Sequence, residues 1–155
     1  MNRRNVLLAA LMSAVLSGCA AVGPQFDERT EPSVADGSAL LYVYRLDTAY
    51  MAARTATIAL DGKKVGNLNR AGYIVAKLKP GTYVLTQNWV QWFGEMGEFN
   101  KPLSTELTLA SGQVSYWLLG TGVYAWRMQP VSAMTARSEL QVLKRQPIEA
   151  PFNNQ

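Results

Sequence analysis

Three glycine-bearing dipeptides divide the middle of this 155-residue chain into short apolar stretches, and this division constrains the fold most strongly. They are Asp61-Gly62, Pro80-Gly81 and Ser111-Gly112. Asp-Gly between alternating stretches favours a hairpin and Pro-Gly favours a type II turn, because glycine accepts positive φ and proline fixes its own φ. The sequence therefore favours short strands joined by turns.

The stretches between these turns have the residue pattern of β-strands. Residues 103–109 alternate between apolar and polar positions, whereas residues 39–45 are rich in aliphatic and aromatic residues on both faces, as in a strand buried on both sides. The predicted strands are residues 39–45, 55–60, 65–68, 73–78, 82–87, 103–109, 114–119 and 124–131. Their number and spacing predict a small antiparallel β-sandwich or barrel-like domain.

The end of the domain has a different period. Ala133, Ala136, Leu140 and Leu143 recur at intervals of three, four and three, as on one face of a helix. Ser132 is available as the N-cap. The sequence therefore predicts one short C-terminal helix, and the alternative is a final strand over residues 139–143.

The first 19 residues have the features of an export signal. Arg3 and Arg4 precede an apolar run over residues 6–15. This arrangement is typical of a cleaved signal peptide, and the run is shorter than the roughly 20 residues that span a bilayer. Leu16-Ser17-Gly18-Cys19 then resembles the lipobox of bacterial lipoproteins.

That resemblance implies cleavage between Gly18 and Cys19, a diacylglyceryl group on the Cys19 sulfur and acylation of the new amino terminus. Several acyl chains anchor a protein firmly, since each buried methylene contributes about 0.8 kcal/mol. Ala20, where an aspartate would favour the inner membrane, implies sorting to the outer membrane of a Gram-negative cell, on the periplasmic side. The alternative is an ordinary secretory signal with an incidental cysteine.

Composition divides the rest of the chain. Residues 19–37 carry turn formers and charges without an apolar period, which predicts a flexible tether unless Phe26 or Val34 packs onto the domain. We expect the β-domain over residues 38–146 and a frayed tail over residues 147–155. Cleavage after residue 18 would leave 13 basic and 11 acidic residues, so the net charge falls from +4 to +2. Nucleic-acid binding is therefore not expected.

Several motifs in the β-domain resemble those of one family. They are Tyr42-Val43-Tyr44-Arg45, Leu60-Asp61-Gly62-Lys63-Lys64-Val65-Gly66, Gly72-Tyr73, Leu78-Lys79-Pro80-Gly81-Thr82-Tyr83 and Ser111-Gly112-Gln113-Val114-Ser115-Tyr116. Together they resemble the bacterial lipoprotein domain of unknown function 2846, over residues 40–143. The resemblance implies an envelope β-domain and brings no catalytic or binding residues with it.

The chain offers few groups for catalysis. It has no histidine, and lipid would consume its single thiol, so the commonest general base and the strongest nucleophile are missing. Its carboxylates lack the spacing of calcium loops, and no serine lies in a G-x-S-x-G motif. Asp61 is expected to bond to backbone amides of its turn. We therefore expect no enzyme, no metal and no cofactor other than the covalent lipid on Cys19.

An aromatic segment supplies the candidate binding surface. Its residues are Trp89, Trp92, Phe93, Glu95, Glu98 and Phe99. Tryptophan is favoured at binding hot spots because it buries a large area with few rotatable bonds. The leading hypothesis is a non-catalytic interaction or scaffold module that engages an envelope protein.

Several alternatives remain open for this segment. A glycan or peptidoglycan could stack on the tryptophans while Glu95 or Glu98 accepts hydrogen bonds from sugar hydroxyls, and a third hypothesis is an enzyme of unrecognised type. Trp89 and Trp92 could instead fill the end of the core, where large aromatic side chains usually lie. Insertion into the bilayer interface also suits tryptophan, although the two acids disfavour it.

Overall fold

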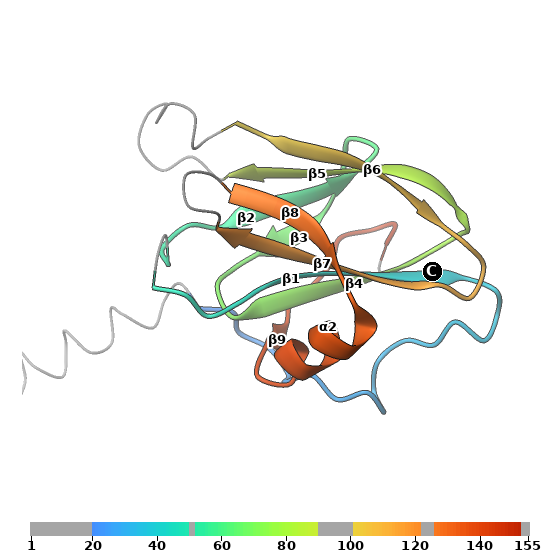
Figure 1. The fold of residues 1–155 in the computed structure, drawn as a ribbon, viewed down its shortest axis with the longest axis horizontal. Helices are drawn as coiled ribbons and strands as arrows, with labels where there is room; N and C mark the ends of the chain where they lie inside the picture. The colour runs from blue at the N-terminus through green and yellow to red at the C-terminus, as the bar shows by residue number, and fades with distance from the viewer. Residues whose placement is uncertain (1–19, 50–51, 90–100, 122–125, 153–155) are drawn as a thin grey trace, which may run out of the picture.

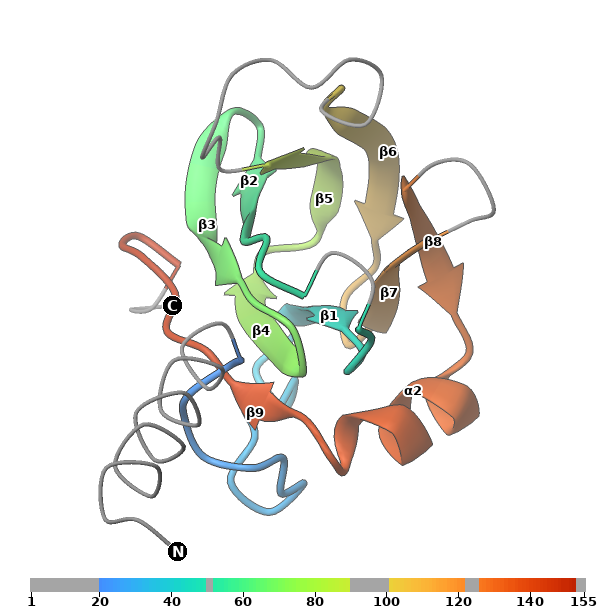
Figure 2. The same cartoon turned by 90° about the vertical axis from the view of Figure 1, so that its left-hand side faces the viewer.

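The computed structural model describes residues 20–49, 52–89, 101–121 and 126–152, and these residues form two stacked β-sheets with one helix beside them (Figures 1 and 2). The elements are β1 Ala39–Arg45, β2 Ala56–Leu60, β3 Lys63–Leu68, β4 Gly72–Leu78, β5 Gly81–Trp89, β6 Leu103–Leu109, β7 Val114–Thr121, β8 Trp126–Val131, α2 Ala133–Leu140 and β9 Lys144–Arg145. The prediction of a mainly β domain with one short C-terminal helix is confirmed.

The two sheets have different strand arrangements. The five-stranded sheet has the order β8-β7-β1-β4-β9, and the four-stranded sheet has the order β3-β2-β5-β6. Most neighbouring strands are antiparallel, but β1 pairs with β7, and β4 with β9, in the parallel direction. The five-stranded sheet is thus mixed rather than purely antiparallel. Parallel pairing requires a long connection, and the strands between β1 and β7 supply one, since all of them except β4 lie in the other sheet.

Two of the turn dipeptides adopt different structures. Asp61 and Gly62 both have positive φ, 49° and 77°, and they join β2 to β3 as the predicted hairpin. The Asp61 carboxylate accepts a hydrogen bond from the Val84 amide of β5 at 2.8 Å. Its partner is thus in the neighbouring strand β5, whereas the sequence predicted an amide of its own turn. Pro80-Gly81 is not a hairpin turn, because β4 and β5 lie in different sheets and Gly81 is already the first residue of β5.

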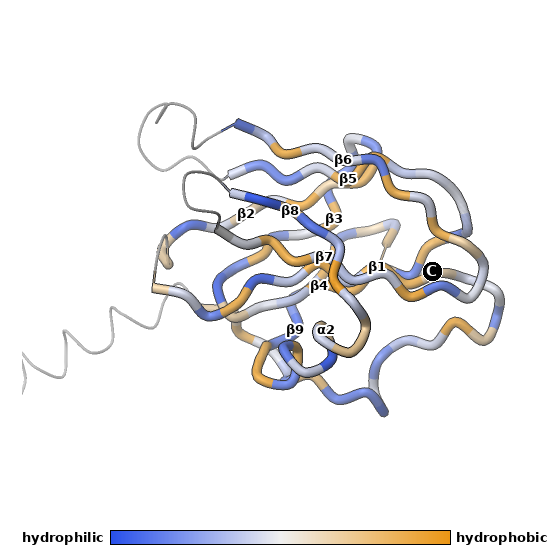
Figure 3. The backbone as a smooth tube through the Cα atoms, viewed as in Figure 1, coloured by the Kyte–Doolittle hydropathy of each residue, from blue (hydrophilic) through white to orange (hydrophobic). Residues whose placement is uncertain are grey.

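Strand β1 is buried along its whole length because it lies between two apolar layers. Leu41 and Val43 point into the core between the sheets. Leu40, Tyr42 and Tyr44 point into a second core, beneath α2 and the N-terminal residues. In Figure 3 hydrophobic residues recur along the strands of both sheets. The prediction of a strand buried on both sides is therefore confirmed.

Helix α2 covers one end of this second core. The Ser132 hydroxyl accepts a hydrogen bond from the Thr135 amide at 3.2 Å and so caps the helix as predicted. Ala136 and Leu140 are fully buried on the predicted face, whereas Ala133 is exposed. The chain then forms the short strand β9, which contains neither Glu139 nor Leu143 of the alternative strand.

Residues 20–37, which we call the N-terminal segment, lie against the five-stranded sheet instead of forming a free tether. The Phe26 amide donates to the Leu143 carbonyl at 3.2 Å, and the Arg145 amide donates to the Pro24 carbonyl at 2.7 Å. The Phe26 ring packs edge-on against Tyr73, with centroids 5.7 Å apart. The prediction of a flexible tether is therefore wrong for these residues. The segment is held by contacts with distant elements, and such contacts leave no periodic pattern in the local sequence.

The C-terminal residues are also packed. Ile148 forms a β-bridge with Gly66, and the Glu149 amide donates to the Val65 carbonyl at 2.7 Å. Phe152 is 8% exposed and belongs to the core between the sheets. Residues 147–152 therefore cover β3 rather than fraying. Their backbone bonds to the outer groups of this edge strand, and the Phe152 side chain is buried in the core.

Candidate functional site

The predicted aromatic surface is described only at Trp89. Trp89 ends β5, where Leu85 and Gln87 precede it on the same inward face, and it is 6% exposed. Its ring centroid lies 4.2 Å from that of Trp126, the first residue of β8. Trp89 is therefore a core residue and not part of an open binding surface. The other predicted members lie outside the described residues: Trp92, Phe93, Glu95, Glu98 and Phe99.

Two arginines accompany these tryptophans at the same end of the sandwich. The Arg45 guanidinium is 5.6 Å from the Trp89 ring centroid and 5.1 Å from that of Trp126. Arg54 lies 5.1 Å from the Trp89 centroid, and its carbonyl accepts a hydrogen bond from Arg45 Nη1. Cations held over aromatic faces in this way are stabilising.

Burial dominates the electrostatics of Arg45. The residue is 1% exposed, and this desolvation, with Arg70 and Arg54 nearby, lowers the pKa of Arg45 to about 10. The sequence contained a signal for its inward position, because Arg45 follows Leu41 and Val43 at intervals of two.

A hollow of about 220 Å³ adjoins this cluster. It is lined by Arg45, Leu46, Thr48, Leu118, Leu119, Gly120 and Trp126. Its volume is below the range of roughly 300–1,000 Å³ typical of small-molecule sites. Its walls combine one guanidinium with apolar groups, so the hollow is suited to non-covalent contact rather than to bond making.

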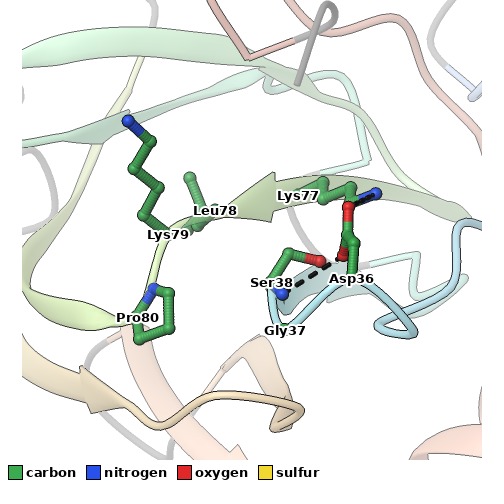
Figure 4. A pocket seen from close by; sticks show the side chains of 7 residues that line it. All are labelled: Asp36, Gly37, Ser38, Lys77, Leu78, Lys79 and Pro80. Atoms are coloured by element: carbon green, nitrogen blue, oxygen red, sulfur yellow. Dashed lines mark hydrogen bonds and ion pairs between the residues drawn. The ribbon is translucent and has the colours of Figure 1, made fainter.

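A second hollow, of about 450 Å³, lies between the N-terminal segment and the end of β4 (Figure 4). Asp36 forms an ion pair with Lys77 at 2.6 Å and accepts a hydrogen bond from the Ser38 amide at 3.2 Å. The hydrogen bond from Lys77, followed by those from Ser38, holds the pKa of Asp36 well below its usual range. A carboxylate whose charged form is stabilised in this way is a poor general base. The ion pair instead has a structural role, because it joins the N-terminal segment to β4.

The predicted lipidation site lies next to a well-defined part of the fold. Cys19 and Gly18 are outside the described residues, but Ala20, the next residue, forms a β-bridge with Arg70. The Ala21 amide donates to the Arg70 carbonyl at 2.8 Å, and Ala21 is 2% exposed. The residue that follows Cys19 is therefore held at the edge of the sandwich.

Two wider features of the described residues bear on chemistry. Over residues 20–49, 52–89, 101–121 and 126–152, no group of three or more histidine, cysteine, aspartate or glutamate side chains could hold a metal ion. In that same part of the chain, no helix has the length and apolar character needed to cross a membrane.

Comparison with known proteins places this fold in a family. No curated protein matches the chain. The family model described as "Protein of unknown function (DUF2846)" matches residues 35–127, which run from the end of the N-terminal segment into β8. This match covers more than half of the chain and includes the hairpin and strand motifs described above. The chain therefore belongs to the DUF2846 family.

Proposed function

We propose that the protein is a lipoprotein of the bacterial outer membrane, anchored through Cys19 and facing the periplasm, and that its β-sandwich is a non-catalytic interaction module. The observation that carries this proposal is the sequence Leu16-Ser17-Gly18-Cys19, which follows two arginines and an apolar run. The docking of Ala20 and Ala21 on Arg70 would hold the body close to that anchor. Ordering a backbone costs about 1–2 kcal/mol per residue, so a segment that served only as a tether would be expected to stay free. The packing of the partly buried Phe26 and the burial of the Glu31 side chain offset this cost and couple the anchor to the body.

Three carboxylates of the described fold support a non-catalytic role because they have structural partners. Asp36 pairs with Lys77, and Asp61 accepts the Val84 amide. Glu31 accepts hydrogen bonds from two tyrosines. The burial of Trp89 also removes one member of the predicted aromatic surface, for a protein partner and for a glycan alike.

Mass spectrometry of the protein purified from membranes tests the anchor. We expect a mature chain that begins at Cys19 and carries the mass of its acyl groups. We expect the Cys19→Ala variant to lack the acyl mass, as an uncleaved or a soluble product. A mature wild-type chain with an unmodified thiol would rule the anchor out.

Crosslinking in intact cells tests the interaction module. We expect the acylated protein to form discrete crosslinked products with envelope proteins, identified by mass spectrometry. Retention on purified peptidoglycan with no protein product would favour the glycan alternative. Turnover of substrates in a broad hydrolase panel would contradict the non-catalytic role.

A further inference from the structure

The docked N-terminal segment determines which side of the sandwich lies next to the anchor. Cys19 is joined to Ala20 by one peptide bond, which places their Cα atoms about 3.8 Å apart. Ala20 is bridged to Arg70, just before β4. We infer that the sandwich stands on the membrane with the edge formed by β3 and β9, together with the residues 147–152 that cover β3, against the lipid headgroups. This inference rests on the proposed acylation of Cys19.

Both sheets end at this edge. Strand β3 is the outer strand of the four-stranded sheet, and β9 is the outer strand of the five-stranded sheet. Gln25 of the N-terminal segment bridges Lys144 of β9. Figure 2 shows β3 and β9 on the same side of the molecule as the start of the N-terminal segment. A lipid at Cys19 therefore emerges beside both strands.

The side chains at this edge suit the headgroup region of a bilayer. Val22 is 81% exposed beside a hollow of about 370 Å³ whose lining includes the amide of Asn67. Lys144 is exposed in β9. An apolar side chain can enter the interface, and amides and ammonium groups can donate to lipid phosphates.

The opposite edge consists of β6 and β8, which contact each other. Strands lie about 4.8 Å apart, so four intervals separate β8 from β9 by about 19 Å and three separate β6 from β3 by about 14 Å. Met134, near the start of α2, follows β8 and is 85% exposed. This edge would face away from the membrane, where a periplasmic partner can reach it.

Lipid-borne quenching of a thiol-attached fluorophore tests the orientation. Cys19 is the only cysteine of the chain, so in the acylated protein an introduced cysteine is the only free thiol. We compare Asn67→Cys on β3 with Met134→Cys on α2, both at exposed positions. The full acylated protein is placed in phosphatidylethanolamine and phosphatidylglycerol vesicles that contain a nitroxide headgroup lipid. We expect loss of emission at position 67 and little loss at position 134.

A third substitution releases the N-terminal segment without altering the anchor. A side-chain carbon at Gly23 would collide with the Arg145 carbonyl oxygen, so Gly23→Ala cannot keep the segment in place. Combined with Asn67→Cys, it should reduce quenching to the level seen at position 134. Circular dichroism checks that the sandwich stays folded, and the comparison of positions 67 and 134 holds without this variant.

The outcomes separate the two proposals. Equal quenching at positions 67 and 134, with acylation of Cys19 confirmed by mass, would overturn the orientation and leave the anchor standing. Stronger quenching at position 134 would reverse the orientation. Protein with an unmodified Cys19 that does not sediment with the vesicles would overturn the proposed anchor itself.

Discussion

Tyr73 of β4 donates a hydrogen bond of 2.6 Å to Glu31 in the N-terminal segment. The other oxygen of the same carboxylate accepts from Tyr42 of β1 at 3.1 Å and lies 3.9 Å from Arg145 Nη1. The Glu31 side chain is only 6% exposed. One buried carboxylate thus joins the segment that follows the anchor to three strands of the five-stranded sheet.

Replacing Glu31 by glutamine should lower the free energy of unfolding by about 1–3 kcal/mol. The amide keeps the shape of the side chain but cannot accept from Tyr42 and Tyr73 with both of its terminal atoms, and an unsatisfied buried group is costly. Urea denaturation measures the change. Glu28→Gln is the matched control, because Glu28 is 60% exposed and 3.6 Å from Arg137. Its effect should stay within about 0.5 kcal/mol, and equal losses in both variants would contradict the prediction.

Stability should fall at alkaline pH because of the buried tyrosines. Burial raises the pKa of Tyr42, Tyr44 and Tyr73 above the ordinary value of 10.0, with added contributions from Glu31 or Glu139. The folded state therefore keeps these protons longer than the unfolded state does. Their contribution is complete below about pH 10 and decreases above it, by up to about 1.4 kcal/mol per pH unit for each tyrosine.

The contribution of Arg45 to stability has the opposite dependence on pH, and the same titration can reveal it. Its folded-state pKa of about 10 is below the ordinary 12.5, so its deprotonation stabilises the fold as pH rises above 10. Three tyrosines outweigh one arginine, and net stability should decrease. Tyr73→Phe removes one titrating group and should flatten the alkaline slope measured by denaturation at several pH values. An unchanged slope would show that Tyr73 does not titrate differently on folding.

Trp89→Ala should destabilise the fold by about 3–5 kcal/mol, the usual cost of removing a large core aromatic side chain. Trp89 packs on Trp126 and lies under Arg45. Thermal and chemical unfolding measure the loss. Met134→Ala is the control, because Met134 is 85% exposed, and its effect should stay within about 0.5 kcal/mol. A stable Trp89→Ala variant that loses partner binding would instead assign Trp89 to an exposed surface.

Phe152→Ala should lower the free energy of unfolding by about 3 kcal/mol, because its side chain belongs to the core between the sheets. Val142→Ala is the comparison, since Val142 is 72% exposed. Limited proteolysis gives an independent measurement: the Phe152 variant should be cleaved faster near its C-terminus. If both variants unfold like the wild type, residues 147–152 do not stabilise the fold.

Short-range patterns were sufficient to predict strands β1 to β8 of this protein, but not the short strand β9. Alternation with period two placed Leu103–Leu109 correctly, and two-sided apolar character identified β1 as buried on both faces. Asp61-Gly62 predicted its hairpin because the required positive φ depends on those two residues alone. Ser132 predicted the start of α2 for the same reason, since its hydroxyl bonds to an amide three residues away.

Long-range pairing was not predictable in this way. The segment before β1 and the residues after β9 look polar and irregular, yet Phe26, Glu31 and Phe152 find partners on strands far away in sequence. Trp89 has an aromatic-rich neighbourhood that suggests a surface, and only its register with Ala56 and its contact with Trp126 make it a core residue.

The amino-acid sequence alone determined the mainly β character, the positions of β1 to β8, the short helix and the likeness of its first 19 residues to a lipoprotein signal, because each depends on residues a few positions apart. The tertiary structure alone decided the mixed five-stranded sheet, the burial of Trp89 and the docking of Ala20 beside Arg70. These features depend on contacts between backbone groups and side chains that are far apart in the sequence, and local residue patterns do not specify those contacts.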